Sequence, residues 1–200
     1  IQMLIRSKYT QPEIAVGYYQ RKAQELNCLD SLGMGIALER QNRVREAEKY
    51  FQKSLGCDQI DPLVNREFGR FFFLTGKYES ALPYLEKAIS QNQDDYLSLY
   101  YKARILKELG KPGQAVAVLR RILRHLPELP EVHSLLGQVY GRNGDRFNGF
   151  LHLAYGALYE NNEKKTEYYL DKIRPLAKSQ TQQKAVDQFL EVYNKRKKFW

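Results

Sequence analysis

The feature that most constrains this 200-residue chain is a pattern that recurs every 34 residues. In windows that begin at residues 28, 62, 96 and 130, the eighth and twentieth positions are small, and the eleventh and twenty-fourth are large and apolar. Small residues let two antiparallel helices approach closely, and large ones fill the space beside them. The small residues are Gly35, Gly69, Ala103 and Gly137 at the eighth position and Ala47, Ala81, Ala115 and Gly149 at the twentieth. We therefore expect two antiparallel helices in each window.

The fifteenth position of each window predicts the turn between these two helices. It holds Asn42, Gly76, Gly110 and Gly144, which are residue types that accept the left-handed conformation at the end of a helix. Pro112 follows one of these turns and is well placed to open a helix. Four copies in phase resemble the tetratricopeptide repeat (TPR), a resemblance that implies an all-α superhelical solenoid of stacked helix pairs.

We predict about eleven antiparallel helices and see no strand pattern. The predicted organisation is a single TPR array over residues 1–200: a partial repeat at 1–27, four repeats at 28–61, 62–95, 96–129 and 130–163, and capping helices at 164–200. In the partial repeat, a helix from Pro12 to Leu26 is expected to be a second helix whose first helix is cut off or lies upstream. The chain opens without an initiator Met, so we expect a fragment or a processed chain.

The phase of the repeat slips after the fourth window. The helix expected from Asp145 to Glu160 therefore has to pair with the helix before it and with the one after it, which we expect from Glu163 to Leu176. A last helix from Thr181 to Lys198 has one apolar side and one charged side. Such an amphipathic helix is suited to covering the exposed end of a solenoid.

Two segments narrow the resemblance. They are Tyr78–Ala88 and the run from Gly137 through Tyr140-Gly141-Arg142 to Gly156, which includes the shared helix. Together they resemble the C-terminal TPR arrays of periplasmic HExxH zinc metallopeptidases of the β-barrel assembly-enhancing type. The resemblance implies a periplasmic docking domain for a substrate or partner, such as unfolded outer-membrane protein segments. A free-standing TPR adaptor or scaffold of pilus or secretion-system assembly stays open as the alternative, as does a cytoplasmic location.

The chain carries no recognisable catalytic motif. Its histidines are His125, His133 and His152, and none begins an HExxH motif. They fall at different phases of the repeat, which favours packing or surface roles over metal binding. No GxSxG elbow, Walker loop or dinucleotide fingerprint is present either. We predict no enzymatic activity, cofactor or metal in this chain; zinc would belong to a catalytic domain outside it.

The two cysteines lie at helix ends of one repeat. Cys28 begins the first helix and Cys57 ends the second. In an antiparallel pair the start of one helix lies beside the end of the other, so a disulfide is sterically conceivable and would fit an oxidising periplasm. Two unconnected cysteines near helix ends remain the alternative.

The position of a residue within its 34-residue window predicts whether it faces a ligand groove. In TPR arrays the first helices line the concave face, and positions two, five, nine, twelve and thirteen of each window are expected to point into it. The central part of this face then forms a basic strip with aromatic residues between the cations. Arginines bind carboxylates in a bidentate manner, and aromatic faces pack apolar side chains. We predict a groove for an acidic or carboxylate-bearing peptide, formed by Arg66, Arg70, Phe73, Tyr100, Arg104, Lys107, Gln138 and Arg142.

A solvated charged face is the alternative to this groove. A clamp for a C-terminal carboxylate is disfavoured, because Arg66 and Arg70 replace the Lys and Asn types of such clamps. In the run of phenylalanines, we place Phe72 in the core, Phe71 beside the core and Phe73 in the groove.

The net charge of +9 is concentrated at the C-terminal end, where residues 161–200 carry 10 basic and 5 acidic side chains. Much of this charge lies in the run from Lys195 to Lys198, which is followed by Phe199 and Trp200. We interpret this run as a solvated helix end. The alternative is a weak contact with an anionic membrane surface. Nucleic acid is disfavoured because the remaining charge is diffuse and no recognition motif is present. No uncharged apolar run approaches the roughly 20 residues of a membrane span.

Overall fold

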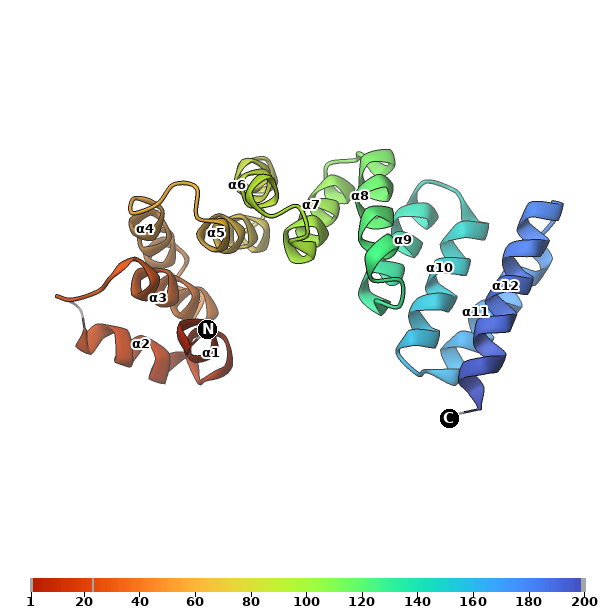
Figure 1. Cartoon of the computed structure of the whole chain (residues 1–200), viewed down its shortest axis with the longest axis horizontal. Coiled ribbons are helices and arrows are strands. Elements are labelled where there is room, and N and C mark those ends of the chain that lie inside the picture. The colour runs from red at the N-terminus through yellow and green to blue at the C-terminus, as the bar shows by residue number, and fades with distance from the viewer. Residues whose placement is uncertain (1, 23, 199–200) are drawn as a thin grey trace. The chain divides into compact units, whose positions relative to one another are not determined.

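The computed structural model describes residues 2–22 and 24–198. Over these residues it consists of twelve α-helices and one 3-10 turn, without a β-strand (Figure 1). The prediction of an all-α fold is confirmed. The helices are α1 Gln2–Tyr9, α2 Pro12–Arg21, α3 Cys28–Arg40, α4 Val44–Leu55, α5 Pro62–Leu74, α6 Tyr78–Gln91, α7 Tyr96–Glu108, α8 Pro112–His125, α9 Pro130–Arg142, α10 Arg146–Tyr159, α11 Glu163–Ile173 and α12 Gln180–Lys197, with the 3-10 turn η1 at Arg174–Leu176.

The chain divides into two compact units, residues 1–101 and residues 102–200. We call them unit 1 and unit 2 and describe each by itself. The boundary falls within α7, whose first residues belong to unit 1 and whose last residues belong to unit 2. The organisation as a single array over the whole chain stays a prediction.

Close helix contact inside each repeat is built as the sequence predicts. In unit 1, α3 packs on α4 and α5 packs on α6. A Cβ atom added to Gly69 would lie 2.7 Å from Cγ of Leu85, and one added to Gly35 would lie 3.2 Å from the ring of Phe51. The eighth position of a repeat therefore lies directly under the twenty-fourth.

The predicted turn residues adopt the left-handed conformation. Asn42 has φ 58°, and Gly76, Gly110 and Gly144 have φ 75°, 67° and 83°. Only glycine and, less easily, asparagine adopt such angles at little cost. Pro112 directly follows Lys111 as the first residue of α8, as predicted. The turns between paired helices are thus set by the residue types at the fifteenth position.

The N-terminal part differs from the prediction. The helix expected from Pro12 to Leu26 ends at Arg21, and the first helix thought to be cut off or upstream is present as α1. The buried residues Ala15 and Tyr19 precede their counterparts in α4 by 32 residues rather than 34. Because of this offset, windows of 34 residues do not reveal the helix before them. A buried hydrogen bond of 2.9 Å between the hydroxyls of Ser7 and Tyr19 joins α1 to α2.

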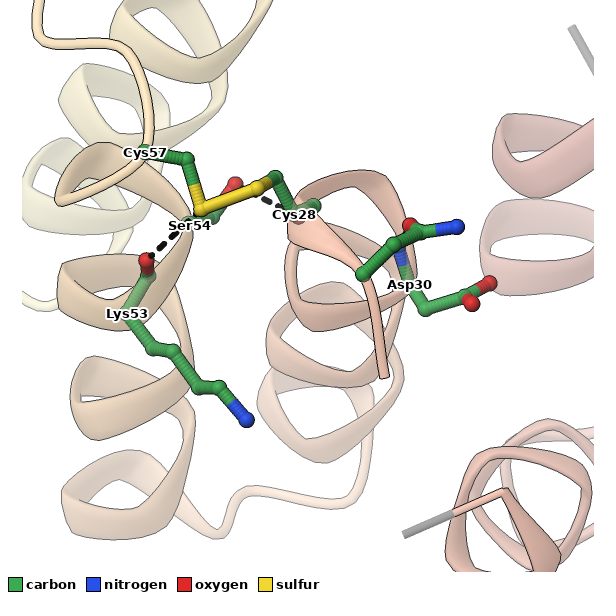
Figure 2. Close-up of a disulfide and its surroundings, with 6 residues drawn as sticks. Cys28, Asp30, Lys53, Ser54 and Cys57 are labelled. Atoms are coloured by element: carbon green, nitrogen blue, oxygen red, sulfur yellow. Dashed lines mark hydrogen bonds between the residues drawn. A yellow bond between two sulfur atoms is a disulfide. The ribbon is translucent and has the colours of Figure 1, made fainter. Parts of the chain in front are cut away.

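Cys28 and Cys57 form a disulfide that joins the start of α3 to the end of α4 (Figure 2). Their Cα atoms are 6.0 Å apart. The buried hydroxyl of Ser54 donates a hydrogen bond of 2.8 Å to the carbonyl of Cys28 at the same place. The alternative of two unconnected cysteines is therefore wrong. The bridge closes the repeat at the end opposite to the turn at Asn42.

Loss of the disulfide should lower the free energy of unfolding of unit 1. The two cysteines are 29 residues apart, and closing such a loop in the unfolded chain corresponds to about 3–4 kcal/mol. Urea unfolding of the oxidised protein and of the Cys28→Ser/Cys57→Ser variant measures this difference. Two thiols that react with iodoacetamide in folded, unreduced protein would contradict the bridge itself.

Unit 2 is organised around α10. This helix packs against α9 before it and α11 after it, and it also contacts α12. The predicted double role of this helix is thus confirmed. Phe147, Leu158 and Phe189 are among the buried residues that join α10, α11 and α12 in one core. Ser179 and Gln182 form a capping box that begins α12.

Two glycines of α9 should respond oppositely to replacement by alanine. A Cβ on Gly137 would lie 2.6 Å from Cγ of Leu153 and 2.8 Å from the carbonyl oxygen of Gly149, so α9 and α10 would have to separate. We expect Gly137→Ala to lower the free energy of unfolding by about 1–3 kcal/mol. Gly141→Ala is the matched control, because nothing lies within 4 Å of a Cβ there; its helix propensity should raise stability by up to about 1 kcal/mol. Equal denaturation midpoints for the two variants would contradict this account of the close contact.

Candidate functional site

Unit 1 contains a cavity of about 310 Å³ lined by four successive first helices, α1, α3, α5 and α7. We call it the first-helix cleft. Its lining residues are Lys8, Tyr9, Ile36, Arg40, Arg70, Leu97 and Tyr101. Tyr9 is 81% exposed and Leu97 is 41% exposed, so apolar surface faces solvent here. Ile36, Arg40, Arg70 and Leu97 occupy window positions that the register assigns to the groove.

A network of charges lies beneath the cleft. The fully buried carboxylate of Glu67 accepts hydrogen bonds of 2.7 Å from Nζ of Lys8 and 2.8 Å from Nε of Arg70. Both terminal nitrogens of Arg70 also bind the carboxylate of Glu39, so this pair is bidentate. Nη1 of Arg66 lies 3.4 Å from the carboxylate of Asp95. The network joins α1, α3 and α5.

The pKa values agree with strong pairing in this network. Burial alone would raise the pKa of Glu67, but the charges of Arg70 and Lys8 outweigh it and hold the pKa below its ordinary value. Burial would likewise lower the pKa of Arg70, yet Glu39 and Glu67 raise it. Both groups are therefore charged at neutral pH and bound to each other. Arg70, predicted to bind a ligand carboxylate, is already engaged with two carboxylates of its own chain.

Arg40 is the cation of the cleft that is exposed. Its Nη1 donates hydrogen bonds to the backbone carbonyls of Ser7 (2.8 Å) and Thr10 (2.7 Å), at the end of α1. A guanidinium has five N–H groups in a planar fork, so Arg40 can hold the end of α1 and still offer donors to a ligand. The side chain that best meets the predicted chemistry is thus Arg40 and not Arg70.

The phenylalanine run is more buried than expected. Phe71 is fully buried, which corrects its placement beside the core. Phe72 belongs to the core, as predicted. Phe73 is 9% exposed, with its ring 5.8 Å from that of Tyr78 and 5.5 Å from that of Tyr101. It therefore supports Tyr101, which lines the cleft, and presents little surface of its own.

Sequence reasoning missed three cleft residues. Lys8 and Tyr9 belong to α1, which the 34-residue windows do not include. The one sequence signal for an earlier helix pair is Ala15, which precedes its counterpart Ala47 by 32 residues. Tyr101 is adjacent to the predicted Tyr100, and their rings meet edge to face at 6.2 Å. In α7 the cleft is thus lined by Tyr101, the neighbour of the predicted Tyr100, and the role of Tyr100 in binding stays a prediction.

The other half of the predicted strip lies in unit 2. Nζ of Lys107 donates a hydrogen bond of 3.2 Å to the side chain of Gln138, and Nη1 of Arg142 lies 3.5 Å from the carboxylate of Glu108. Lys107, Glu108 and Arg142 line a cavity of about 370 Å³. Arg104 is half-buried in α7. That the residues of both units form one groove stays a prediction.

The basic C-terminal run is partly used within unit 2. Arg196 binds Glu128 at 3.0 Å, and Lys197 binds Glu163 at 2.9 Å, so these cations attach α12 to its neighbours. Lys195 and Lys198 are exposed. Phe199 and Trp200 lie outside the described residues, and the weak membrane contact stays a prediction. No helix of the described part is both long and apolar enough to cross a bilayer.

Two histidines meet in unit 2. His133 lies in α9 and His152 in α10, with their Nδ1 atoms 3.0 Å apart, and Nε2 of His133 lies 2.9 Å from the carbonyl of Pro127. Burial lowers the pKa of both histidines, so both rings are neutral near pH 7. Since Nε2 of His133 donates to that carbonyl, its Nδ1 then accepts the proton of His152 Nδ1. Residues 2–22 and 24–198 contain no group of three or more His, Cys, Asp or Glu side chains that could hold a metal.

Stability of unit 2 should fall in mild acid because of this pair. Burial and, after it, the charge of His133 lower the pKa of His152 from 6.5 to about 3. In the unfolded chain His152 is protonated below about pH 6.5, whereas in the folded chain it stays neutral down to about pH 3. The free energy of unfolding therefore decreases as pH falls from about 6.5 to about 3. His152→Asn keeps a donor near Nδ1 but cannot titrate, so its stability should depend less on pH. Urea midpoints between pH 7 and pH 4 measure this.

If His152→Asn loses as much stability between pH 7 and pH 4 as the unchanged protein does, the acid sensitivity does not arise from the buried pair.

Comparison with known proteins identifies the repeats. Two tetratricopeptide-repeat family models match residues 32–96 and residues 72–139. Among curated proteins, the cell division cycle protein 27 homolog B of Arabidopsis thaliana is 26% identical over 120 residues, which is 60% of this chain and 16% of that protein. Homolog A of the same plant is 31% identical over 87 residues, or 42% of this chain and 12% of that protein. The matched part is thus a small share of either relative.

Solved structures show the same fold. MamA from MSR-1 superposes with a TM-score of 0.69 at 18% identity, over 80% of this chain and 93% of that one. A chain of the APC/C hetero-tetramer Cut9–Hcn1 gives a TM-score of 0.69 at 19% identity, over 80% of this chain and 32% of that one. At such low identity the similarity concerns the fold alone.

Proposed function

The chain is a tetratricopeptide-repeat protein, and from this premise we propose that it is a protein–protein interaction module whose first-helix cleft holds an extended polypeptide segment. The observation that carries the proposal is the cavity that α1, α3, α5 and α7 line together in unit 1. Because the cleft is lined by four different helices, an extended peptide can contact several repeats at once. The proposed role is binding, without catalysis.

The chemistry of the cleft supports a segment with both apolar and acidic residues. Tyr9 in α1 and Leu97 in α7 both expose apolar surface in the lining. Tyrosine buries a large area at low entropic cost, which makes it an effective anchor for partner side chains. Arg40 supplies an exposed fork of donors for a carboxylate. We therefore propose a ligand with an apolar side chain near an Asp or Glu.

Binding can be tested with an array of twelve-residue peptides that combine one apolar residue with one acidic residue. For the tightest binder, fluorescence anisotropy should show at least a roughly tenfold loss of affinity in Leu97→Asp, because the new carboxylate repels the ligand and removes apolar contact. Because Arg40 also holds the end of α1, Arg40→Gln should weaken the acidic peptide more than its Asp→Asn counterpart.

Ile14→Asp is the matched control, because Ile14 is also apolar and exposed but lies on α2 and does not line the cleft. It should bind as the unchanged protein does. Unchanged affinity in Leu97→Asp, with its melting temperature preserved, would reject the cleft as the binding site.

The place of this module in a larger protein is a separate proposal. The resemblance of Gly137–Gly156 supports the docking domain of a periplasmic zinc metallopeptidase, and the Cys28–Cys57 disulfide supports an oxidising compartment. In that setting the module would hold a polypeptide near the catalytic zinc and raise its effective concentration. The gene sequence upstream tests this: an HExxH helix would support the protease, and a lipobox would support the adaptor or scaffold of pilus or secretion-system assembly.

A further inference from the structure

A second and larger cavity of unit 1 lies between the second helices α4 and α6 and measures about 570 Å³. We call it the second-helix cleft. Its lining residues are Leu55, Gln59, Phe72, Ser80, Pro83, Tyr84 and Lys87. None of them lines the first-helix cleft. The second-helix cleft is therefore independent of the function proposed above.

The walls of the second-helix cleft are aromatic and fixed. The rings of Phe72 and Tyr84 lie 4.5 Å and 4.7 Å from the ring of Phe68, which is buried in the core, and 5.5 Å from each other. Leu55 and Pro83 complete the apolar surface. Because the rings are held by the core, a planar side chain can pack on them without ordering them first.

Polar side chains stand beside these rings. The hydroxyl of Ser80 and the amide of Gln59 belong to the lining. These groups suit the N–H and C=O groups of a peptide backbone.

The charge at this cleft is positive. Lys87 is exposed and forms no ion pair with any residue in the described ranges. Lys77, close by on the same repeat, is already bound to Glu48 at 2.9 Å, with its ammonium 5.3 Å from the centre of the Phe72 ring. An unpaired cation at the rim of an aromatic cleft favours a carboxylate next to the docked ring.

The wall formed by residues 55–61 is held in place from two sides. The fully buried Asn65 donates hydrogen bonds to the carbonyls of Gln59 (3.0 Å) and Asp61 (2.8 Å). The disulfide anchors Cys57, which lies between the lining residues Leu55 and Gln59. Breaking the disulfide would release one of these two anchors of the wall.

We propose that the second-helix cleft is a second docking site, which takes a partner segment with an aromatic side chain beside a carboxylate and depends on the Cys28–Cys57 disulfide for its shape. The ring packs on Phe72 and Tyr84, the carboxylate lies at Lys87, and the backbone pairs with Gln59 and Ser80.

N-acetyl-L-tryptophan, which carries one ring and one carboxylate, is a suitable probe for NMR titration of the full chain. We expect amide shifts at residues 55–59 and 80–87, with at least a roughly fivefold weaker response to N-acetyl-L-tryptophanamide, which lacks the carboxylate. Lys87→Met should abolish this preference for the acid, and Tyr84→Ala should reduce binding of both compounds. Reduced protein should bind the acid at least about threefold more weakly.

Lys53→Met is the control for charge, since Lys53 lies in α4 near the disulfide but does not line the cleft. It should keep the preference for the acid. The proposal is overturned if the probe shifts no residue of the lining, if the acid and the amide bind equally to the unchanged protein, or if Lys87→Met, with its melting temperature unchanged, keeps the preference. Equal binding by oxidised and reduced protein overturns the role of the disulfide.

Discussion

The close approach of two helices within each repeat is the constraint on which the rest of the structure depends. Gly69 and Gly137 leave no room for a side chain, since Leu85 and Leu153 already occupy the space that a Cβ would need. Helices this close expose only their outer faces, so each helix has one face for the core and one for solvent. The first helices then share one surface and the second helices another, which is why unit 1 carries two separate clefts.

Burial of one carboxylate determines the charge of the first-helix cleft. A buried charge is strongly unfavourable unless it is paired, and Glu67 is fully buried. Lys8 and Arg70 bind it, and Arg70 in turn binds Glu39. Lys8 and Arg70 therefore hold α1, α3 and α5 together, although the sequence alone would assign such cations to a ligand. What remains for a partner in this lining is the exposed guanidinium of Arg40, together with the exposed side chains of Tyr9 and Leu97.

The period of 34 residues was sufficient to predict the all-α fold, the left-handed turns and the shared role of α10, because these depend on residues close in sequence. The partners of the arginines were not predictable in this way. Arg70 and Glu39 are 31 residues apart, and Arg66 and Asp95 are 29 apart, so their pairing depends on the rotation of one repeat against the next. The disulfide was only partly predictable. The antiparallel pairing of two helices brings Cys28 and Cys57 to the same end of the repeat, but it does not by itself fix the distance between them.

Helix geometry makes the two clefts of unit 1 compatible with each other. Arg70 lines the first-helix cleft and Phe72 lines the second-helix cleft, and both belong to α5. Two residues along an α-helix are separated by about 200° around its axis, so these side chains leave α5 on nearly opposite sides. A ligand in one cleft therefore does not displace a ligand in the other. Two weakly binding segments of one partner can then combine their binding free energies, provided that the chain between them is long enough to pass around the repeat.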